Sequence, residues 1–135
     1  MVLGRFEHTI VVLNLFPIAK GQVLILPKKH VDSLEFLTTA ARKELIEIIT
    51  GVAEILRKEV SADGINVGIN MGAAAGASKP DHLHIQVLPR FKNEHPAYIE
   101  KLGQTTVVCW DLNRLCRALR PAFDKFKEKY YGLCR

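Results

Sequence analysis

Hydrophobic residues in the first part of the chain form two short runs separated by turn residues. The run at 9–14 is apolar and β-branched, the run at 22–26 is apolar, and Pro17 and Gly21 lie between them. Runs of this kind, bounded by Pro and Gly, are typical of strands joined by a turn. The pattern therefore predicts a β-hairpin.

Two amphipathic helices are predicted further along the chain. Between Thr39 and Val60 the apolar residues recur at intervals of three, four and seven positions, namely at Leu45, Ile48, Ile49, Val52, Ile55, Leu56 and Val60. This spacing places them on one helical face, and Thr38 or Thr39 offers a hydroxyl for the N-cap. A second apolar stripe covers about Trp110 to Tyr130, where Pro121 predicts a kink or a break.

Two other segments, 65–70 and 82–88, alternate with the period of two that is typical of strands. Their odd-numbered positions are apolar, whereas the even-numbered positions of the second segment carry His82, His84 and Gln86. Alternation also places Asp81 on the face opposite to His82. Strands and two separated helices, without regular strand–helix alternation, predict an α+β domain built on an antiparallel sheet.

Length and composition favour one globular domain. The chain has 135 residues, 48% of them hydrophobic, with a mean hydropathy of +0.07, so we expect a single domain over residues 1–135. No apolar run approaches the roughly 20 residues of a membrane-spanning helix. The first residues lack the apolar core of a signal peptide, so we expect a cytoplasmic protein.

Charge and cysteine content narrow the chemistry only slightly. The 19 Lys and Arg residues exceed the 14 Asp and Glu residues, which favours an anionic partner such as a nucleotide, a nucleic acid or an anionic lipid.

The 3 cysteines are odd in number and lack C-x-x-C spacing, so they indicate neither a disulfide framework nor a zinc knuckle. Cys109 and Cys116 lie among apolar residues and are expected to pack as small hydrophobic side chains.

The row formed by His82, His84 and Gln86 admits three interpretations. Side chains two apart on a strand are roughly 6.5 Å apart, so neighbours can touch one small anionic group. The first interpretation is a solvated face of a half-buried strand. The second is a metal site, which needs a third ligand from His30, His95 or a carboxylate.

The third interpretation is a phosphate-binding site beside a nucleophile. The small residues at 72–78, Gly76 among them, let backbone N–H groups approach a phosphate closely, and Ser78 and Lys79 add donors shortly before the histidines. Such loops are more often simple turns, so this loop is evidence for a phosphate site only together with the histidine row. For His30 we favour a structural role over substrate contact.

At this point the sequence resembles the histidine triad (HIT) superfamily. Its motif, His-φ-His-φ-His-φ-φ, is matched by 82–88 at every position except the third histidine, which is Gln86. Further blocks are similar and in the same order, at 13–17, 21–30, 66–72 and 75–76. The ending at 119–123 is similar to bacterial members of the fragile-histidine-triad branch. Gln22 departs from the family's Gly-His-Val-Leu block.

The resemblance implies a homodimeric α+β protein that binds a nucleotide and cleaves or transfers at its α-phosphate. It implies that His84 is the nucleophile, that His82 and Gln86 flank it, and that Asn14 contacts the ribose. It further implies that the phosphate chain lies near Asn70, Gly76 and Ser78. Magnesium is expected to bind with the phosphates of the substrate, and no metal held by the protein is expected.

The residue types agree with such roles. A neutral imidazole can attack phosphorus through one nitrogen while the other N–H is held by an acceptor. Gln86 donates hydrogen bonds but cannot deliver a proton, so the leaving group must be a good one, such as the ATP or ADP end of a dinucleoside polyphosphate. The sequence therefore predicts a hydrolase or nucleotidyltransferase of diadenosine tetra- or triphosphate.

Three alternatives stay open. His-φ-His-φ-Gln patterns also occur in branches of the family that transfer the nucleotidyl group to phosphate, so the enzyme is alternatively a phosphorylase. A nucleotide-binding module with little turnover is the second alternative, and loss of turnover in His84→Ala would argue against it. Nucleic-acid binding through the basic surface is the third alternative, and it is less favoured because few aromatic residues are interleaved with the lysines.

Overall fold

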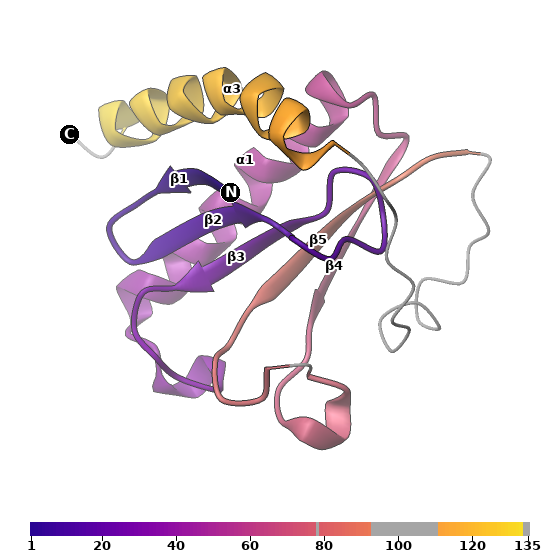
Figure 1. The fold of residues 1–135 in the computed structure, drawn as a ribbon. Helices are drawn as coiled ribbons and strands as arrows, with labels where there is room; N and C mark the ends of the chain where they lie inside the picture. Colours follow the sequence, from indigo (N-terminus) through magenta and orange to yellow (C-terminus); the bar gives the residue numbers. More distant parts are fainter. Residues whose placement is uncertain (78, 93–110, 134–135) are drawn as a thin grey trace.

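The computed structural model describes residues 1–77, 79–92 and 111–133. Its five-stranded sheet has the order β1-β2-β3-β5-β4, and every neighbouring pair is antiparallel. The strands are β1 (Val2–Arg5), β2 (Thr9–Leu13), β3 (Val23–Pro27), β4 (Gly64–Ile69) and β5 (Ile85–Arg90). The helices are α1 (Thr39–Glu59) and α3 (Leu112–Leu133), with short 3₁₀ turns η1 (Leu34–Phe36) and η2 (Ala73–Ala75). Figure 1 shows α1 behind the sheet. The expected α+β class with an antiparallel sheet is confirmed.

The predicted hairpin is present as β2 and β3, which pair from Thr9 opposite Pro27 to Leu13 opposite Val23. β1 was not anticipated from the sequence. It has only four residues, too few to show a period of two, and it becomes a strand because β2 offers it an edge for pairing. The sheet therefore extends one strand beyond the hairpin.

The long helix matches its prediction closely. α1 begins after Thr38, whose side chain accepts a hydrogen bond from the N–H of Ala41 at 3.2 Å. Ile48, Val52 and Leu56 are fully buried at its centre, because the helical period directs them at the sheet. α1 thereby closes one face of β2, β3 and β5.

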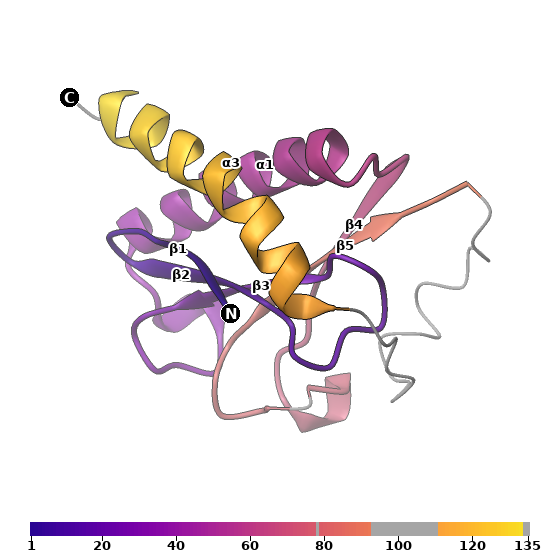
Figure 2. The same ribbon diagram turned by 45° about the horizontal axis from the view of Figure 1, so that its top comes forward.

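The second helix is not broken at Pro121, one of the two outcomes that this proline predicts. α3 continues through it, and Figure 2 shows α3 crossing in front of α1. Proline removes one backbone N–H, a cost that the packing of the neighbouring Leu119 and Phe123, each 1% exposed, offsets. The buried Cys116 packs as expected, whereas Cys109 and the predicted start at Trp110 lie outside the described residues.

The two helices that the structure describes, α1 and α3, pack together and α1 covers one side of the sheet, and the site lies on the other side. The side chains of Leu24 and Leu26 on β3 point away from α1 and stay half-buried. At the sheet edge, Val67 of β4 is 43% exposed although it pairs with the buried Val87. Among the described residues, neither helix has the length and apolar character that crossing a bilayer requires.

Candidate functional site

The three residues of the histidine row do not all lie on a strand. β5 begins only at Ile85, so His82 and His84 precede it, which corrects the predicted strand from 82 to 88. The chain is held there by a hydrogen bond from the N–H of Leu83 to the carbonyl of Val31, at 2.6 Å, in place of a sheet ladder. The row therefore bends around the end of the sheet.

His84 lies buried at this point, 7% exposed, which excludes the interpretation of the row as a solvated face at this residue. Its Nδ1 is 3.0 Å from the carbonyl oxygen of His82. A carbonyl only accepts hydrogen bonds, so Nδ1 carries the proton in the neutral ring. The lone pair of the neutral imidazole is then on Nε2, which is the atom available as a nucleophile.

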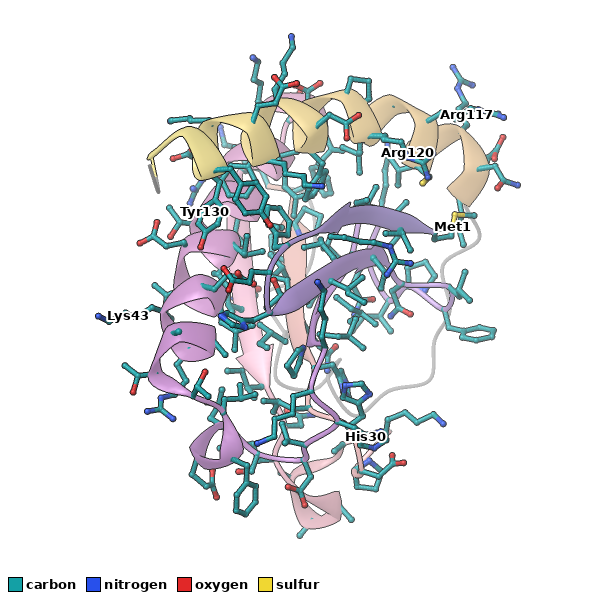
Figure 3. The ribbon with its side chains drawn as sticks, turned by 90° about the vertical axis from the view of Figure 1, so that its left-hand side faces the viewer. Met1, His30, Lys43, Arg117, Arg120 and Tyr130 are labelled. Atoms are coloured by element: carbon teal, nitrogen blue, oxygen red, sulfur yellow. The ribbon has the colours of Figure 1, made fainter. Side chains whose placement is uncertain are left out.

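His82 is oriented in a similar way from a different strand. Its Nε2 donates to the carbonyl oxygen of Pro27, at the end of β3, across 3.1 Å. Its ring stacks on that of His30, with centroids 4.6 Å apart and an angle of 17° between planes. His30 Nε2 is in turn 3.9 Å from Asp81 Oδ2. Figure 3 shows His30 at the end of the molecule opposite to α3.

These contacts correct one expectation. Asp81 is expected from the sequence on the face opposite to His82, but alternation applies only within a strand, and Asp81 lies in the turn before β5. Both residues line one cavity. His30, for which the sequence favours a structural role, lies beside the histidine row with its side chain 66% exposed and stacks on His82, so its role stays a prediction. No local pattern in the sequence linked it to His82.

The cavity has a volume of about 400 Å³ and opens beside the histidines. Both polar and apolar side chains line it, the complete set being Asn14, Phe16, Leu24, Leu26, His30, Lys79, Asp81, His82 and His84. The Oδ1 of Asn14 accepts the N–H of Phe16 at 3.1 Å, so its amide NH₂ is left to donate. Apolar walls with a few convergent polar groups suit a nucleoside attached to phosphate.

Gln86 is placed on β5, opposite Leu24 of β3 and Gly68 of β4. Its Oε1 accepts a hydrogen bond from Nε2 of Gln22, at 3.1 Å. Gln22 is almost fully buried, 1% exposed, and its own Oε1 accepts the N–H of Ile18 at 2.8 Å. Gln86 thus lies on β5 two residues after His84, is not among the residues that line the cavity, and is hydrogen-bonded to a second glutamine.

The remaining predicted phosphate-contacting residues form a separate loop after β4. Asn70 Nδ2 donates to the carbonyl of Gly76, at 3.2 Å, and closes the loop around η2. Gly72 and Gly76 have φ values of +83° and +81°, which favour glycine. Neither Asn70 nor Gly76 lines the cavity, and Ser78 lies outside the described residues. Their roles stay predictions.

The metal interpretation of the histidine row stays a prediction. Within residues 1–77, 79–92 and 111–133, metal-ligand atoms gather closely only at Glu7, His8 and Glu44, within 4.8 Å of one another. There Glu44 Oε1 already accepts hydrogen bonds from the N–H of His8 and the hydroxyl of Thr9. His95, the other proposed ligand, lies outside the described residues.

Comparison with known proteins agrees with the motif. Residues 1–93 match the family model described as HIT domain. An AP-4-A phosphorylase from Mycobacterium tuberculosis is 32% identical over 108 residues, which is 80% of this chain and 55% of the relative. A bis(5'-adenosyl)-triphosphatase from Saccharomyces cerevisiae is 35% identical over 120 residues, 84% of this chain and 58% of the relative. The chain thus spans a little over half the length of these relatives.

Solved structures show the same fold. A zinc-bound histidine triad family protein from Mycobacterium smegmatis superposes with a TM-score of 0.78 at 23% identity, covering 95% of this chain and 86% of the other. The NitFhit protein of C. elegans gives a TM-score of 0.72 at 26% identity, covering 90% of this chain and 27% of the other.

Proposed function

Because this chain belongs to the histidine triad (HIT) family, we propose that it is an enzyme that cleaves dinucleoside polyphosphates at the α-phosphate. The observation that carries the proposal is the buried His84, whose Nδ1–H is held by the carbonyl of His82 and whose Nε2 is left as the nucleophile. Relatives named for phosphorolysis and hydrolysis of such dinucleotides support the substrate class.

In the first step, Nε2 of His84 attacks the α-phosphorus and an N–P bond forms. The bond from phosphorus to the bridging oxygen breaks, and the polyphosphate leaves as an anion, which needs no proton. His84 then carries a positive charge across the ring, which the His82 carbonyl at Nδ1 stabilises. The nucleoside occupies the cavity lined by Leu24 and Leu26, and Lys79 attracts the phosphate chain.

In the second step an acceptor attacks the nucleotidyl group and the N–P bond breaks. Water must lose a proton to become an effective nucleophile, and the amide of Gln86 cannot accept it. The dianion of inorganic phosphate already carries an anionic oxygen. Gln86 therefore favours phosphate as the acceptor, and phosphorolysis is the second candidate beside hydrolysis.

Diadenosine tetraphosphate with magnesium is the test substrate, with and without inorganic phosphate, and chromatography resolves the products. AMP and ATP without phosphate establish a hydrolase. ADP and ATP formed only with phosphate establish a phosphorylase. Absence of turnover in both mixtures, with bound substrate detected by calorimetry, would contradict the proposed enzyme and favour a nucleotide-binding module.

Three finer features belong to the same proposal. Magnesium enters with the phosphates of the substrate, and the protein holds no metal of its own for the reaction.

The chain forms a homodimer, which the exposed Val67 at the β4 edge supports. Light scattering tests the homodimer by comparing Val67→Asp with the unchanged protein. Localisation to the cytoplasm stays a prediction, to be tested by fractionation.

A further inference from the structure

We propose that Gln22 is a positioning residue that decides which end of the Gln86 amide faces the reacting phosphate. The inference rests on the proposed function and adds to it a second layer behind the histidine row. It starts from the finding that the two positions at which the sequence departs from the HIT pattern, 22 and 86, are in direct contact.

The orientation of Gln22 is fixed by a group that has only one role. The N–H of Ile18 can donate but not accept, so the atom of Gln22 that lies 2.8 Å from it is the amide oxygen. The NH₂ group of Gln22 then points the other way, toward Gln86. Because Gln22 is 1% exposed, water does not compete for this amide.

The orientation of Gln86 follows from that of Gln22. A donor at 3.1 Å requires an acceptor, so Gln86 turns its Oε1 toward Gln22. Its NH₂ group has no hydrogen-bond partner among the residues that the structure describes. That group is left as a donor on β5, two residues after His84.

The direction of this amide matters because the substrate is an anion. An NH₂ group attracts the oxygens of the transferring phosphoryl group, whereas an amide oxygen in the same place repels them. An isolated glutamine populates both orientations. Two hydrogen bonds in series, from the N–H of Ile18 to Gln22 and from Gln22 to Gln86, select the donating orientation. Gln22 therefore acts on the reaction without touching the substrate.

Gln22→Glu reverses the direction of the hydrogen bond between positions 22 and 86 with almost no change in side-chain shape. The carboxylate still accepts from Ile18, but it offers Gln86 an acceptor in place of a donor, so Gln86 turns its NH₂ inward and its oxygen toward the phosphate. We expect kcat for diadenosine tetraphosphate to fall on the order of tenfold to a hundredfold. Assays of all variants at about pH 9 keep the buried carboxyl ionised, because burial raises carboxyl pKa values.

Gln22→Met is the matched control. It keeps the volume of the side chain but leaves Gln86 free to adopt either orientation, so we expect a loss of only about two- to fivefold. The two variants remove the same hydrogen bond and differ in the direction imposed on Gln86. Equal losses would overturn the proposal. A larger loss for Gln22→Glu also includes direct repulsion between the added carboxylate and the phosphates, and the double-mutant cycle below separates this repulsion from the turning of Gln86.

A double-mutant cycle tests whether the effect passes through Gln86. In a Gln86→Met background there is no amide to turn, so adding Gln22→Glu is expected to cause no further loss of kcat. Additive losses would overturn the proposal. Thermal melting of each variant, with the same transition midpoint as the unchanged protein, identifies the variants that are folded and suitable for the comparison.

The proposed function and this inference can fail separately. If the unchanged protein does not cleave diadenosine tetraphosphate, the proposed function fails. The orientation of Gln86 is then read from the affinity for ADP measured by calorimetry. Weaker binding by Gln22→Glu than by Gln22→Met that disappears when Gln86 is also changed to Met supports the inference. Equal binding by the two variants, or a difference that persists with Gln86→Met, overturns it.

Discussion

The imidazole of His84 donates through Nδ1 to the carbonyl oxygen of His82, two residues earlier, across 3.0 Å. The bond is made possible by the turn before β5, because side chains on a regular strand point away from their own backbone carbonyls two residues back. It assigns the proton to Nδ1 and the lone pair to Nε2. The backbone carbonyl of His82 therefore selects the tautomer of His84 that the proposed covalent catalysis requires.

His84→Ala is expected to lower turnover of diadenosine tetraphosphate by roughly a thousandfold or more, because covalent catalysis loses its nucleophile. Affinity for ATP, measured by calorimetry, should change only a few-fold, since the cavity wall is otherwise intact. Acid quenching of the unchanged enzyme should trap one AMP on His84, detectable by mass spectrometry. Full activity of His84→Ala would contradict the assignment.

His30 supports the ring of His82 by stacking, and two variants separate this role from its contact with Asp81. His30→Phe keeps a flat ring and should retain most of kcat. His30→Ala removes the ring and should lower kcat about two- to tenfold, the value of an aromatic pair. Steady-state kinetics check both, and equal activities for Phe and Ala would exclude a role for the stack.

Glu44 joins α1 to the start of β2, because its Oε1 accepts from the N–H of His8 at 2.9 Å and from Thr9 Oγ1 at 2.8 Å. Glu44→Ala leaves both donors without an acceptor, and we expect the free energy of unfolding to fall by about 3 kcal/mol. Glu47→Ala, at an exposed position of the same helix, should change stability by less than about 0.5 kcal/mol. Urea denaturation measures both, and similar losses would refute the prediction.

At Gly51 of α1 the ring of Phe126 from α3 packs directly against the helix backbone. A Cβ placed there would lie 2.1 Å from Cζ of Phe126, whose ring also meets that of Phe6 at 5.7 Å between centroids. Gly51→Ala should therefore lower the melting temperature, even though alanine favours helices by about 1 kcal/mol.

Gly132→Ala is the control for Gly51→Ala, because a Cβ there meets nothing within 4 Å. It should leave the melting temperature unchanged or raise it slightly, because the helix preference of alanine meets no overlap there. Combining Gly51→Ala with Phe126→Leu should cost less than the sum of the single variants, since the smaller side chain relieves the overlap. Strict additivity of the two losses would show that the contact is not the cause.

Local patterns determined much of this protein. The apolar spacing between Thr39 and Val60 was enough to locate α1, and the β-branched runs at 9–14 and 22–26 located the central hairpin, because both signals depend only on neighbouring side chains. The motif at 82–88 pointed to His84 as the proposed nucleophile by its resemblance to a family. These inferences needed no knowledge of which strands would pair.

Tertiary structure decided the rest, because the remaining contacts join residues that are far apart in sequence. β3 lies between β2 and β5, and only this order of strands brings Gln22 within hydrogen-bond distance of Gln86, 64 positions away. The same arrangement brings His30 against His82. Side-chain periodicity reports which face a residue occupies but not which strand lies beside it, so the sequence alone could list these residues without joining them.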